Sequence, residues 1–353
     1  MDGSMSPASL DWPMDRWSTT RILVTGGASF ISSHLIDLLV AKGARTIRVV
    51  DDLSSGKLEN VKDHIESGVV EFRQEDLLGP GAAQKAVAGI DMVFHLAAIH
   101  GGRGYVDLHQ ALCAQNLAMD GMLIKAAHEA GVGKFVFASS GCVYPNFLQS
   151  DVSQELYLTE QMVGPPYDAD NMYGWAKLMT ELTLKSYHKD LGFKSASCRF
   201  FTVYGERGVE NHAVIAMIAR AFVRQDPFDL WGDGTQVRNW TYVGDIVSGM
   251  VAAAERIDDG TAVNLGTEER TRVIDAAREV LRYTGQSADI KLLPHMPTGP
   301  LNRVASNRLA RELLGWEPKT MFMDGLHRTI EWYFASKQRE SVASYLPELL
   351  TER

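Results

Sequence analysis

Short apolar runs that alternate with helical stretches constrain the fold of this chain more than any other feature of its sequence. The runs with the character of β-strands in the first half of the chain are Arg21–Thr25, Thr46–Asp51, Val69–Arg73, Met92–Leu96 and Lys134–Ser139. The helical stretches between them lie near Phe30–Lys42, Ala82–Val87 and Leu108–Ala130. Repeated strand–helix units predict a parallel sheet with helices on both faces. We therefore predict an α/β protein with a Rossmann-type, doubly wound sheet.

The length of 353 residues suits one large α/β unit or two domains that share a cleft. We expect a Rossmann domain over residues 21–204, which includes a further strand at Ser195–Phe200. The pattern is less regular after Gly205, so we expect residues 205–340 to form mainly a smaller α/β region that binds the substrate. Residues 1–20 and 341–353 are predicted to be flexible tails, and residues 1–20 lack the apolar run of a signal peptide.

Charge and cysteine content exclude several classes of function. The net charge of −9 argues against a nucleic-acid or anionic-membrane partner, and no window approaches the roughly 20 apolar residues of a membrane span. Cys113, Cys142 and Cys198 are too few and too irregularly spaced for a disulfide framework or a zinc site. We expect no metal, and a reducing cytoplasm as the location.

A glycine-containing turn follows the first strand directly. Gly26 and Gly27 lead through Ala28-Ser29-Phe30-Ile31-Ser32 into an apolar helix. Such a turn aims the free N–H groups of a helix N-terminus at a pyrophosphate. Serines occupy positions 29 and 32, where the dinucleotide fingerprint has glycines, so a plain strand–helix turn remains an alternative. The predicted dinucleotide contacts in this turn are Gly26, Ser29, Phe30 and Ile31.

The ends of the later strands supply further groups for a dinucleotide. Asp51 follows the turn by about 25 residues, where a carboxylate can hold a ribose 2′-hydroxyl. Its charge repels a 2′-phosphate, so we predict NAD as the cofactor rather than NADP. Asp76-Leu77 is a candidate for contact with the adenine, and Ala97-Ala98 leaves room for the cofactor backbone. His95 is expected to be a packed structural residue.

Tyr173 and Lys177 stand four residues apart on a predicted helix that runs to about Leu191. Side chains at this spacing are neighbours, so the ammonium is expected to lower the pKa of the phenol by favouring its charged form. A tyrosine with a lowered pKa can act as a general base toward a hydroxyl group. Tyrosine and lysine are common on helices, so the pair gains its meaning from the other motifs of the chain.

Taken in order, these motifs resemble those of the extended short-chain dehydrogenase/reductase family that acts on nucleotide sugars. The resemblance runs from about Arg21 to about Phe334. Its motifs are Thr25-Gly26-Gly27-Ala28, His95-Leu96-Ala97-Ala98, Ser139-Ser140-Gly141-Cys142-Val143-Tyr144-Pro145, Tyr173 with Lys177, Val203-Tyr204-Gly205, Trp231-Gly232-Asp233-Gly234 with Arg238, and Leu314-Gly315-Trp316-Glu317-Pro318. Within the family, the serine–cysteine motif and His100-Gly101-Gly102-Arg103-Gly104 most resemble the GDP-mannose 3,5-epimerases.

The resemblance implies an enzyme whose bound NAD oxidises a nucleotide sugar at its 4-position. In this reaction Tyr173 takes the proton of the hydroxyl, and Ser140 hydrogen-bonds the same oxygen. Lys177 tunes Tyr173 and holds the nicotinamide ribose, so both also count as cofactor contacts. Asn116 occupies a helix position where relatives carry an asparagine near this lysine, and it is predicted to contact the cofactor. The resemblance further implies a homodimer.

The expected substrate is a nucleotide-diphosphate sugar, whose anionic diphosphate requires cationic side chains. By resemblance, Arg238 and Arg303 bind the diphosphate or the nucleoside. Thr202 stands where relatives have an asparagine that contacts the diphosphate. His100, Gly102 and Arg103 match a loop that faces the sugar in the 3,5-epimerases, and His212 is a further candidate contact.

Several reactions can follow oxidation at the 4-position. Sugar dehydratases carry Asp-Glu where this chain has Gly141-Cys142, so dehydration is disfavoured. Cys142 matches the acid/base cysteine of the 3,5-epimerases, but their second group, a lysine, is missing from residues 204–212, where only His212 could substitute. We therefore place 4-epimerisation first and 3,5-epimerisation second.

Other functions rank lower. Decarboxylation of a uronate is disfavoured because the acidic residue usual beside Ser140 is absent. Asp51 argues against an NADPH-dependent epimerase-reductase, and the presence of both Tyr173 and Lys177 argues against a non-enzymatic NAD-binding regulator. The nucleotide (UDP, GDP or ADP) and the sugar stay open.

Overall fold

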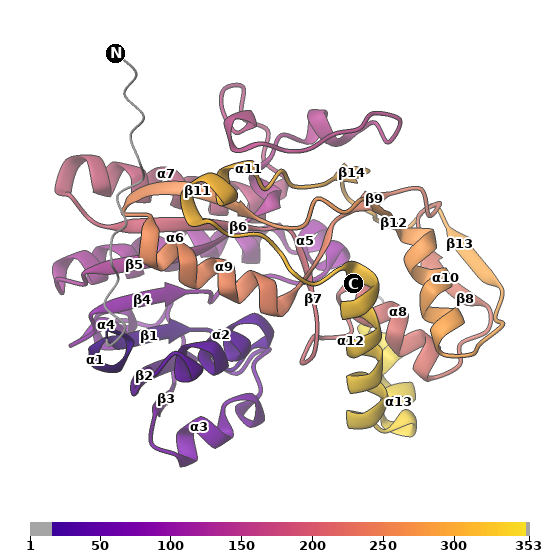
Figure 1. Cartoon of the computed structure of the whole chain (residues 1–353), viewed down its shortest axis with the longest axis horizontal. Helices are drawn as coiled ribbons and strands as arrows, with labels where there is room; N and C mark the ends of the chain where they lie inside the picture. The colour runs from indigo at the N-terminus through magenta and orange to yellow at the C-terminus, as the bar shows by residue number, and fades with distance from the viewer. Residues whose placement is uncertain (1–15, 351–353) are drawn as a thin grey trace.

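The computed structural model describes residues 16–350, which form a central parallel sheet with a smaller lobe at one end (Figure 1). The strand order of the sheet is β11-β6-β5-β4-β1-β2-β3, and all neighbours pair in parallel. Its strands are β1 (Arg21–Thr25), β2 (Thr46–Asp51), β3 (Val70–Gln74), β4 (Met92–His95), β5 (Lys134–Ser140), β6 (Ser195–Phe200) and β11 (Asp259–Leu265). The order reverses direction between β1 and β4, where the doubly wound fold opens a crevice for ligands at the carboxyl ends of the strands. The predicted fold class is confirmed.

Helices cover both faces of the sheet, as expected for strands that are apolar on both sides. One face packs against α2 (Phe30–Ala41) and α9 (Val243–Arg256), whose buried residues join those of β1 and β2 in one core. The other face packs against α4 (Ala82–Val87) and α6 (Gln110–Glu129), and α6 packs in turn against α7 (Asn171–Leu191). The short helices α3 (Lys62–Glu66) and α5 (Arg103–Leu108) lie in the connections.

The smaller lobe has its own core, which α8, α10, α12 and α13 share with β8 and β10. Its helices are α8 (Ala213–Phe222), α10 (Val273–Tyr283), α12 (Phe322–Ser336) and α13 (Arg339–Leu349), while α11 (Arg308–Leu314) packs on α9 and β11. Its short strands are β7 (Thr202–Tyr204), β8 (Phe228–Trp231), β9 (Val237–Arg238), β10 (Trp240–Tyr242), β12 (Thr271–Arg272), β13 (Ile290–Leu293) and β14 (Asn302–Arg303). Strand β9 lies between β12 and β14, and this places Arg238 beside Arg303 in register.

The structure corrects both predicted tails. Residues 16–19 form the helix α1 (Arg16–Thr19), and Trp17 is only 3% exposed because it packs into the core beside α2 and α9. Residues 339–349 form α13, which buries Val342 and Leu346 in the core of the smaller lobe. The few apolar side chains that anchor these segments lie among polar residues, and this concealed them. The remainder of the N-terminal tail, residues 1–15, lies outside the described residues.

The boundary expected at residue 205, between the Rossmann domain and the smaller region, is crossed by a later part of the chain. Residues 243–265 return to the Rossmann domain, because α9 packs on the central sheet and β11 forms its edge next to β6. The helix expected near residues 108–130 is α6, and the short helix α5, which was not predicted, precedes it across the non-helical backbone of His109. Within residues 16–350, no helix is both long and apolar enough to span a membrane.

Candidate active site

A cavity of about 380 Å³ lies between the sheet's carboxyl edge and the smaller lobe. Both parts of the chain line it, and it collects most of the residues predicted for the site. The predicted residues in its wall are Ser29, Phe30, Ile31, Ala98, His100, Gly102, Arg103, Ser140, Cys142, Tyr173, Lys177, Thr202, His212, Arg238 and Arg303. The predicted residues outside its wall are Gly26, Asp51, Asp76, Leu77, Ala97 and Asn116.

Ser140, Tyr173 and Lys177 meet because two elements approach each other closely. Ser140 is the last residue of β5, and Tyr173 lies in the first turn of α7. The Tyr173 hydroxyl hydrogen-bonds the Ser140 side chain, whose oxygen also accepts the backbone N–H of Cys142 at 3.1 Å. The Lys177 ammonium lies 4.6 Å from the centroid of the Phe137 ring and 5.6 Å from that of Tyr173. This cation–π geometry fixes the ammonium on the floor of the cavity.

The electrostatics of this pair correct one prediction. Burial raises the pKa of Tyr173 far above its ordinary value, and the hydrogen bond with Ser140 opposes the shift only in part. Burial also lowers the pKa of Lys177. The expected lowering of the Tyr173 pKa by Lys177 is therefore not met, because removal of both groups from water outweighs their attraction.

The turn after β1 has the features of a dinucleotide site. Gly26 has a φ of +64°, and a side chain there would lie 3.0 Å from the Ala97 Cα atom, so the turn needs glycine for its close approach to β4. Asp51 is buried and accepts the backbone N–H groups of Ala28 at 3.0 Å and Leu53 at 2.8 Å. Burial raises the pKa of Asp51, and these hydrogen bonds oppose the rise. The N-terminus of α2 lines the cavity at Ser29, Phe30 and Ile31; the Ser29 N–H is donated to the Gly26 carbonyl at 3.1 Å, so the first turn of the helix after Ser29 supplies the N–H groups for an anion.

Three predicted residues outside the cavity wall have evident structural contacts. Leu77 packs in the core beneath the sheet, and the Asp76 carboxylate accepts the backbone N–H of Leu78 at 2.9 Å. The Asn116 side chain accepts the N–H of Ile99 at 2.8 Å and donates to its carbonyl at 2.9 Å. Asn116 therefore fixes the segment that leads to His100. His95 is fully buried, as expected of a structural histidine.

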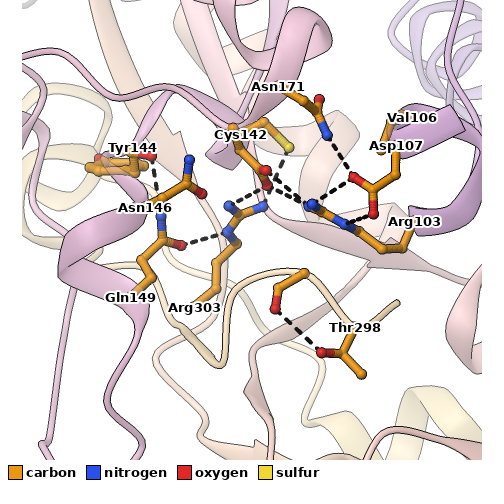
Figure 2. Close-up of polar contacts among 12 residues, drawn as sticks. Arg103, Val106, Asp107, Cys142, Tyr144, Asn146, Gln149, Asn171, Thr298 and Arg303 are labelled. Atoms are coloured by element: carbon orange, nitrogen blue, oxygen red, sulfur yellow. Dashed lines mark hydrogen bonds and ion pairs between the residues drawn. The ribbon is translucent and has the colours of Figure 1, made fainter. Parts of the chain in front are cut away.

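Arg103 and Arg303 converge on one carboxylate that the sequence analysis missed (Figure 2). Asp170 accepts Arg103 at 2.8 Å and Arg303 at 3.0 Å. Arg303 also donates to the Cys142 sulfur at 3.3 Å and to the Gln149 side chain at 2.7 Å. The position of Asp170 as the N-cap of α7 was a signal in the sequence, whereas that of Gln149 depends on tertiary structure.

Arg238 completes a cluster of three arginines around this carboxylate. Its guanidinium donates to two backbone carbonyls, Val237 at 2.9 Å and Thr298 at 2.8 Å. Burial and the charges of Arg303 and Arg103 lower the pKa of Arg238 to about 9. The cluster carries more positive than negative charge, so it suits an anionic ligand. Residues 297–300, which also line the cavity, were not predicted.

Two histidines lie near Tyr173 in the cavity. The His100 ring lies 6.4 Å from the Tyr173 ring and 5.9 Å from the His212 ring, measured between centroids. His100 is open to the cavity, yet the surrounding walls and the charge of Lys177 lower its pKa to about 4. His100 is therefore neutral at physiological pH and can donate or accept a hydrogen bond. Thr202, at the start of β7, lines the same cavity.

The loop that carries His212 is tied to both lobes. On one side, His34 of α2 contacts the backbone oxygen of Glu206 at 2.9 Å. On the other, the buried Glu210 carboxylate accepts the hydroxyls of Tyr333 and Tyr345 at 2.9 Å each, and pairs with Lys337 at 3.2 Å. The C-terminal helices thereby fix one wall of the cavity.

No grouping of three or more histidine, cysteine, aspartate or glutamate side chains within residues 16–350 has the arrangement of a metal site. The site instead combines a dinucleotide turn, a serine–tyrosine–lysine set and an arginine cluster. This combination defines a class of oxidoreductase-like enzymes that act on anionic carbohydrate derivatives. The chain belongs to the NAD dependent epimerase/dehydratase family, whose model matches residues 22–266.

Two relatives and one solved structure are similar to this chain over most of its length. The chain is 31% identical over 334 residues to GDP-mannose 3,5-epimerase 1 of Oryza sativa subsp. japonica, covering 93% of this chain and 85% of the relative. It is 32% identical over 327 residues to an uncharacterized UDP-glucose epimerase of Bacillus subtilis, covering 91% and 100%. Among solved structures, UDP-glucuronic acid 4-epimerase from Bacillus cereus in complex with UDP-glucuronic acid and NAD matches with a TM-score of 0.79 and 28% identity, covering 88% and 98%.

Proposed function

We propose that this protein is a nucleotide-sugar epimerase that works by transient oxidation with NAD and inverts carbon 4 of the sugar. One observation carries the proposal: Ser140, Tyr173 and Lys177 line the same cavity as the N-terminus of α2 and the arginine cluster. A nucleotide sugar needs all three parts, because its diphosphate is anionic, its hydroxyl needs a base and its hydride needs an acceptor. The relatives named above support the same class of substrate.

Each catalytic residue has a distinct role in the proposed oxidation. Tyr173 accepts the proton of the sugar 4-hydroxyl, Ser140 hydrogen-bonds the same oxygen, and Lys177 stabilises the phenolate. When bound, NAD supplies a hydride acceptor and a positive ring that favours the phenolate. Burial alone keeps the phenol of Tyr173 protonated. Tyr173 can therefore act as a base only when NAD and the substrate are bound, because the positive ring of NAD favours the phenolate.

The cofactor contacts follow from the same arrangement. We infer that the N–H groups of Phe30 and Ile31 at the start of α2, together with the Ser29 side chain, hold the pyrophosphate. Asp51 lies at the end of β2 and is proposed to bind the adenosine ribose, where its charge disfavours the 2′-phosphate of NADP. We propose Arg238 and Arg303 as the diphosphate contacts.

Inversion at carbon 4 needs no group beyond those already named. The 4-keto sugar turns over in the cavity, and hydride returns to its other face. The sugar end of the cavity carries His100, Thr202 and His212, which suit hydrogen bonds to hydroxyl groups. Arg103, which also reaches this end, is already paired with Asp107 and Asp170.

Inversion at carbons 3 and 5 is a second candidate, which one contact favours. The Cys142 sulfur lines the cavity and accepts a hydrogen bond from Arg303 at 3.3 Å, so a cationic donor is in place beside a potential acid/base group. His212 reaches the cavity from the smaller lobe and is the group available to act on the other face of the sugar.

Incubation with UDP-, GDP- and ADP-sugars in deuterated water separates the two candidates. We expect inversion at carbon 4 without solvent deuterium, as read by NMR of the products. Deuterium at carbon 3 or 5 would overturn the first choice. Cys142→Ser is expected to keep a near-normal rate for 4-epimerisation and to lose at least about 100-fold for 3,5-epimerisation. Tyr173→Phe is the matched control, since it removes the base from either reaction.

We also propose a homodimer that forms through α6 and α7. These adjacent helices expose apolar side chains to solvent, including Leu112 (41% exposed), Met122 (39%) and Met179 (45%). Alanines at positions 111 and 118 are also exposed on α6 and permit close packing of a second copy. A cytoplasmic location is inferred from the three cysteines, which are all unpaired.

A further inference from the structure

A buried chain of hydrogen bonds connects strand β1 to the catalytic helix. The Thr25 hydroxyl oxygen accepts the backbone N–H groups of residues 96 and 97 at 3.1 Å each, and lies 2.7 Å from His95 Nδ1. His95 Nε2 lies 2.9 Å from one carboxylate oxygen of Asp120. The other oxygen of Asp120 accepts the Thr180 hydroxyl of α7 at 2.8 Å. All four side chains are buried.

The hydrogen bonds assign the proton positions along this chain. Because Thr25 already accepts two N–H groups, its own O–H must donate to His95 Nδ1. The His95 proton therefore sits on Nε2 and is donated to Asp120, so the imidazole is an uncharged donor. Asp120, which is 1% exposed, accepts hydrogen bonds only from neutral groups in this chain. A buried carboxylate in this position requires a cation nearby.

Lys177 is that cation. It is 1% exposed, and it precedes Thr180 by three residues, so both side chains lie on the same face of α7. Helix α6, which carries Asp120, packs along α7. The Phe137 ring contacts both Lys177 and the buried hydrogen-bond chain: its centroid is 4.6 Å from the Lys177 ammonium and 5.9 Å from the His95 ring centroid.

We propose that Asp120 is a positioning residue, the buried counter-ion that keeps the Lys177 ammonium charged and in place for catalysis. The role is distinct from those of Ser140 and Tyr173, because Asp120 does not line the cavity and cannot touch a substrate. The catalytic consequence rests on the proposed function, whereas the pairing itself does not.

The other ionisable groups around Lys177 do not replace Asp120. Tyr173 shares its helix, Cys142 approaches from the segment after β5, and His100 approaches from the segment after β4. Burial lowers the pKa of Lys177. The charge of Asp120 makes the largest contribution in the opposite direction, and Cys142 makes the next largest. Tyrosine, cysteine and histidine are neutral in their ordinary forms near pH 7, so Asp120 supplies the permanent negative charge.

The substitution Asp120→Asn separates charge from structure. Its amide oxygen can accept the His95 N–H, and its amide N–H can be donated to the Thr180 hydroxyl, which then donates to the Ala176 carbonyl 3.0 Å away. The hydrogen bonds are thus conserved while the negative charge is lost. Thr180→Val is the matched control, because it removes one hydrogen bond and keeps the carboxylate.

The pKa of Lys177 can be measured without any substrate, by NMR titration of the full-length protein with ¹³Cε-labelled lysine. Lys177 is assigned by the signal missing from Lys177→Arg. We expect Asp120→Asn to lower the Lys177 titration midpoint by up to about one pH unit, since a neighbouring opposite charge favours the charged form of the ammonium. Thr180→Val is expected to titrate like the wild type.

Superimposable titrations of the wild type and Asp120→Asn would overturn the proposal, as would an equal shift in Thr180→Val. If Asp120→Asn does not fold, Asp120→Ser serves for the same comparison, because it leaves room for a bridging water. With an active nucleotide sugar, the alkaline limb of the kcat profile should move to lower pH by the same amount. Failure of all nucleotide sugars to react would refute the proposed function and leave the NMR result intact.

Discussion

Replacement of Gly174 by alanine tests how closely the catalytic helix must approach the segment after β5. An alanine Cβ atom at this position would lie 2.3 Å from the Cys142 carbonyl oxygen and 3.0 Å from its carbonyl carbon. That oxygen also accepts the backbone N–H of Asp170 at 2.8 Å, so it is fixed over the first turn of α7. An ordinary carbon–oxygen contact is about 3.3 Å, so the helix and the segment must separate by about 1 Å.

The expected losses of stability and of kcat follow from this displacement. Overpacking costs about 1–3 kcal/mol, and the better helix propensity of alanine returns up to about 1 kcal/mol. We therefore expect Gly174→Ala to lower the free energy of unfolding by about 1–2 kcal/mol. Because Ser140 and Tyr173 lie on opposite sides of the contact, a 1 Å misplacement should lower kcat by about 100-fold.

Urea unfolding and steady-state kinetics measure the two effects separately. Gly121→Ala is the matched control, since Gly121 is also helical and an alanine there meets no atom within 4 Å. The control is expected to gain about 0.5–1 kcal/mol and to keep its activity. If Gly174→Ala were as stable as Gly121→Ala and retained kcat within about twofold, the reasoning from close contact would be refuted.

Two further predictions concern the smaller lobe and the helical surface. The pKa of Glu210 is lowered despite its burial, because Lys337 and the hydroxyls of Tyr345 and Tyr333 stabilise its carboxylate. Its contribution to stability is therefore present above the unfolded pKa of about 4.3, and it is lost as the pH falls below that value. Glu210→Gln should thus be less stable than the wild type by about 1–3 kcal/mol at pH 7. In urea titrations this difference in the free energy of unfolding should disappear between about pH 5 and 3. A difference that does not change with pH would contradict the prediction. Met122→Glu is expected to convert a homodimer into monomers in light scattering, and an unchanged mass would exclude α6 from the interface.

Much of the fold was predictable because its signals are local. The bounds predicted for β1, β2 and β6 agree with the structure, and in β1 and β2 the signal is a short run that is mainly apolar. The helix predicted near residues 108–130 agrees with α6 within two residues, whereas the short helix α5 before it was not predicted, because residues 101–104 include three glycines, which disfavour helix. The burial of Trp17 beside α9 joins parts of the chain more than 200 residues apart, which no local pattern encodes.

The residues of the candidate site could be predicted where they belong to a short sequence motif. Tyr173 and Lys177 are fixed by helix periodicity, and Ser140 by the end of a strand. The pKa of Tyr173 was predicted in the wrong direction, because spacing reports proximity of charge but not the depth of burial. Asp170 and Asp120 were missed for a related reason: their roles depend on which cations the fold brings to them.

The contact between Glu210 and Tyr345 has a consequence for how the enzyme matures. The central sheet and the turn after β1 are complete by residue 265, whereas the loop that carries His212 is held by hydroxyl and ammonium groups of residues 333–345. Translation therefore finishes the wall of the cavity formed by the sheet before it makes the residues that anchor the opposite wall. A chain truncated before Tyr333 is expected to bind the dinucleotide and to lose the anchor of this loop.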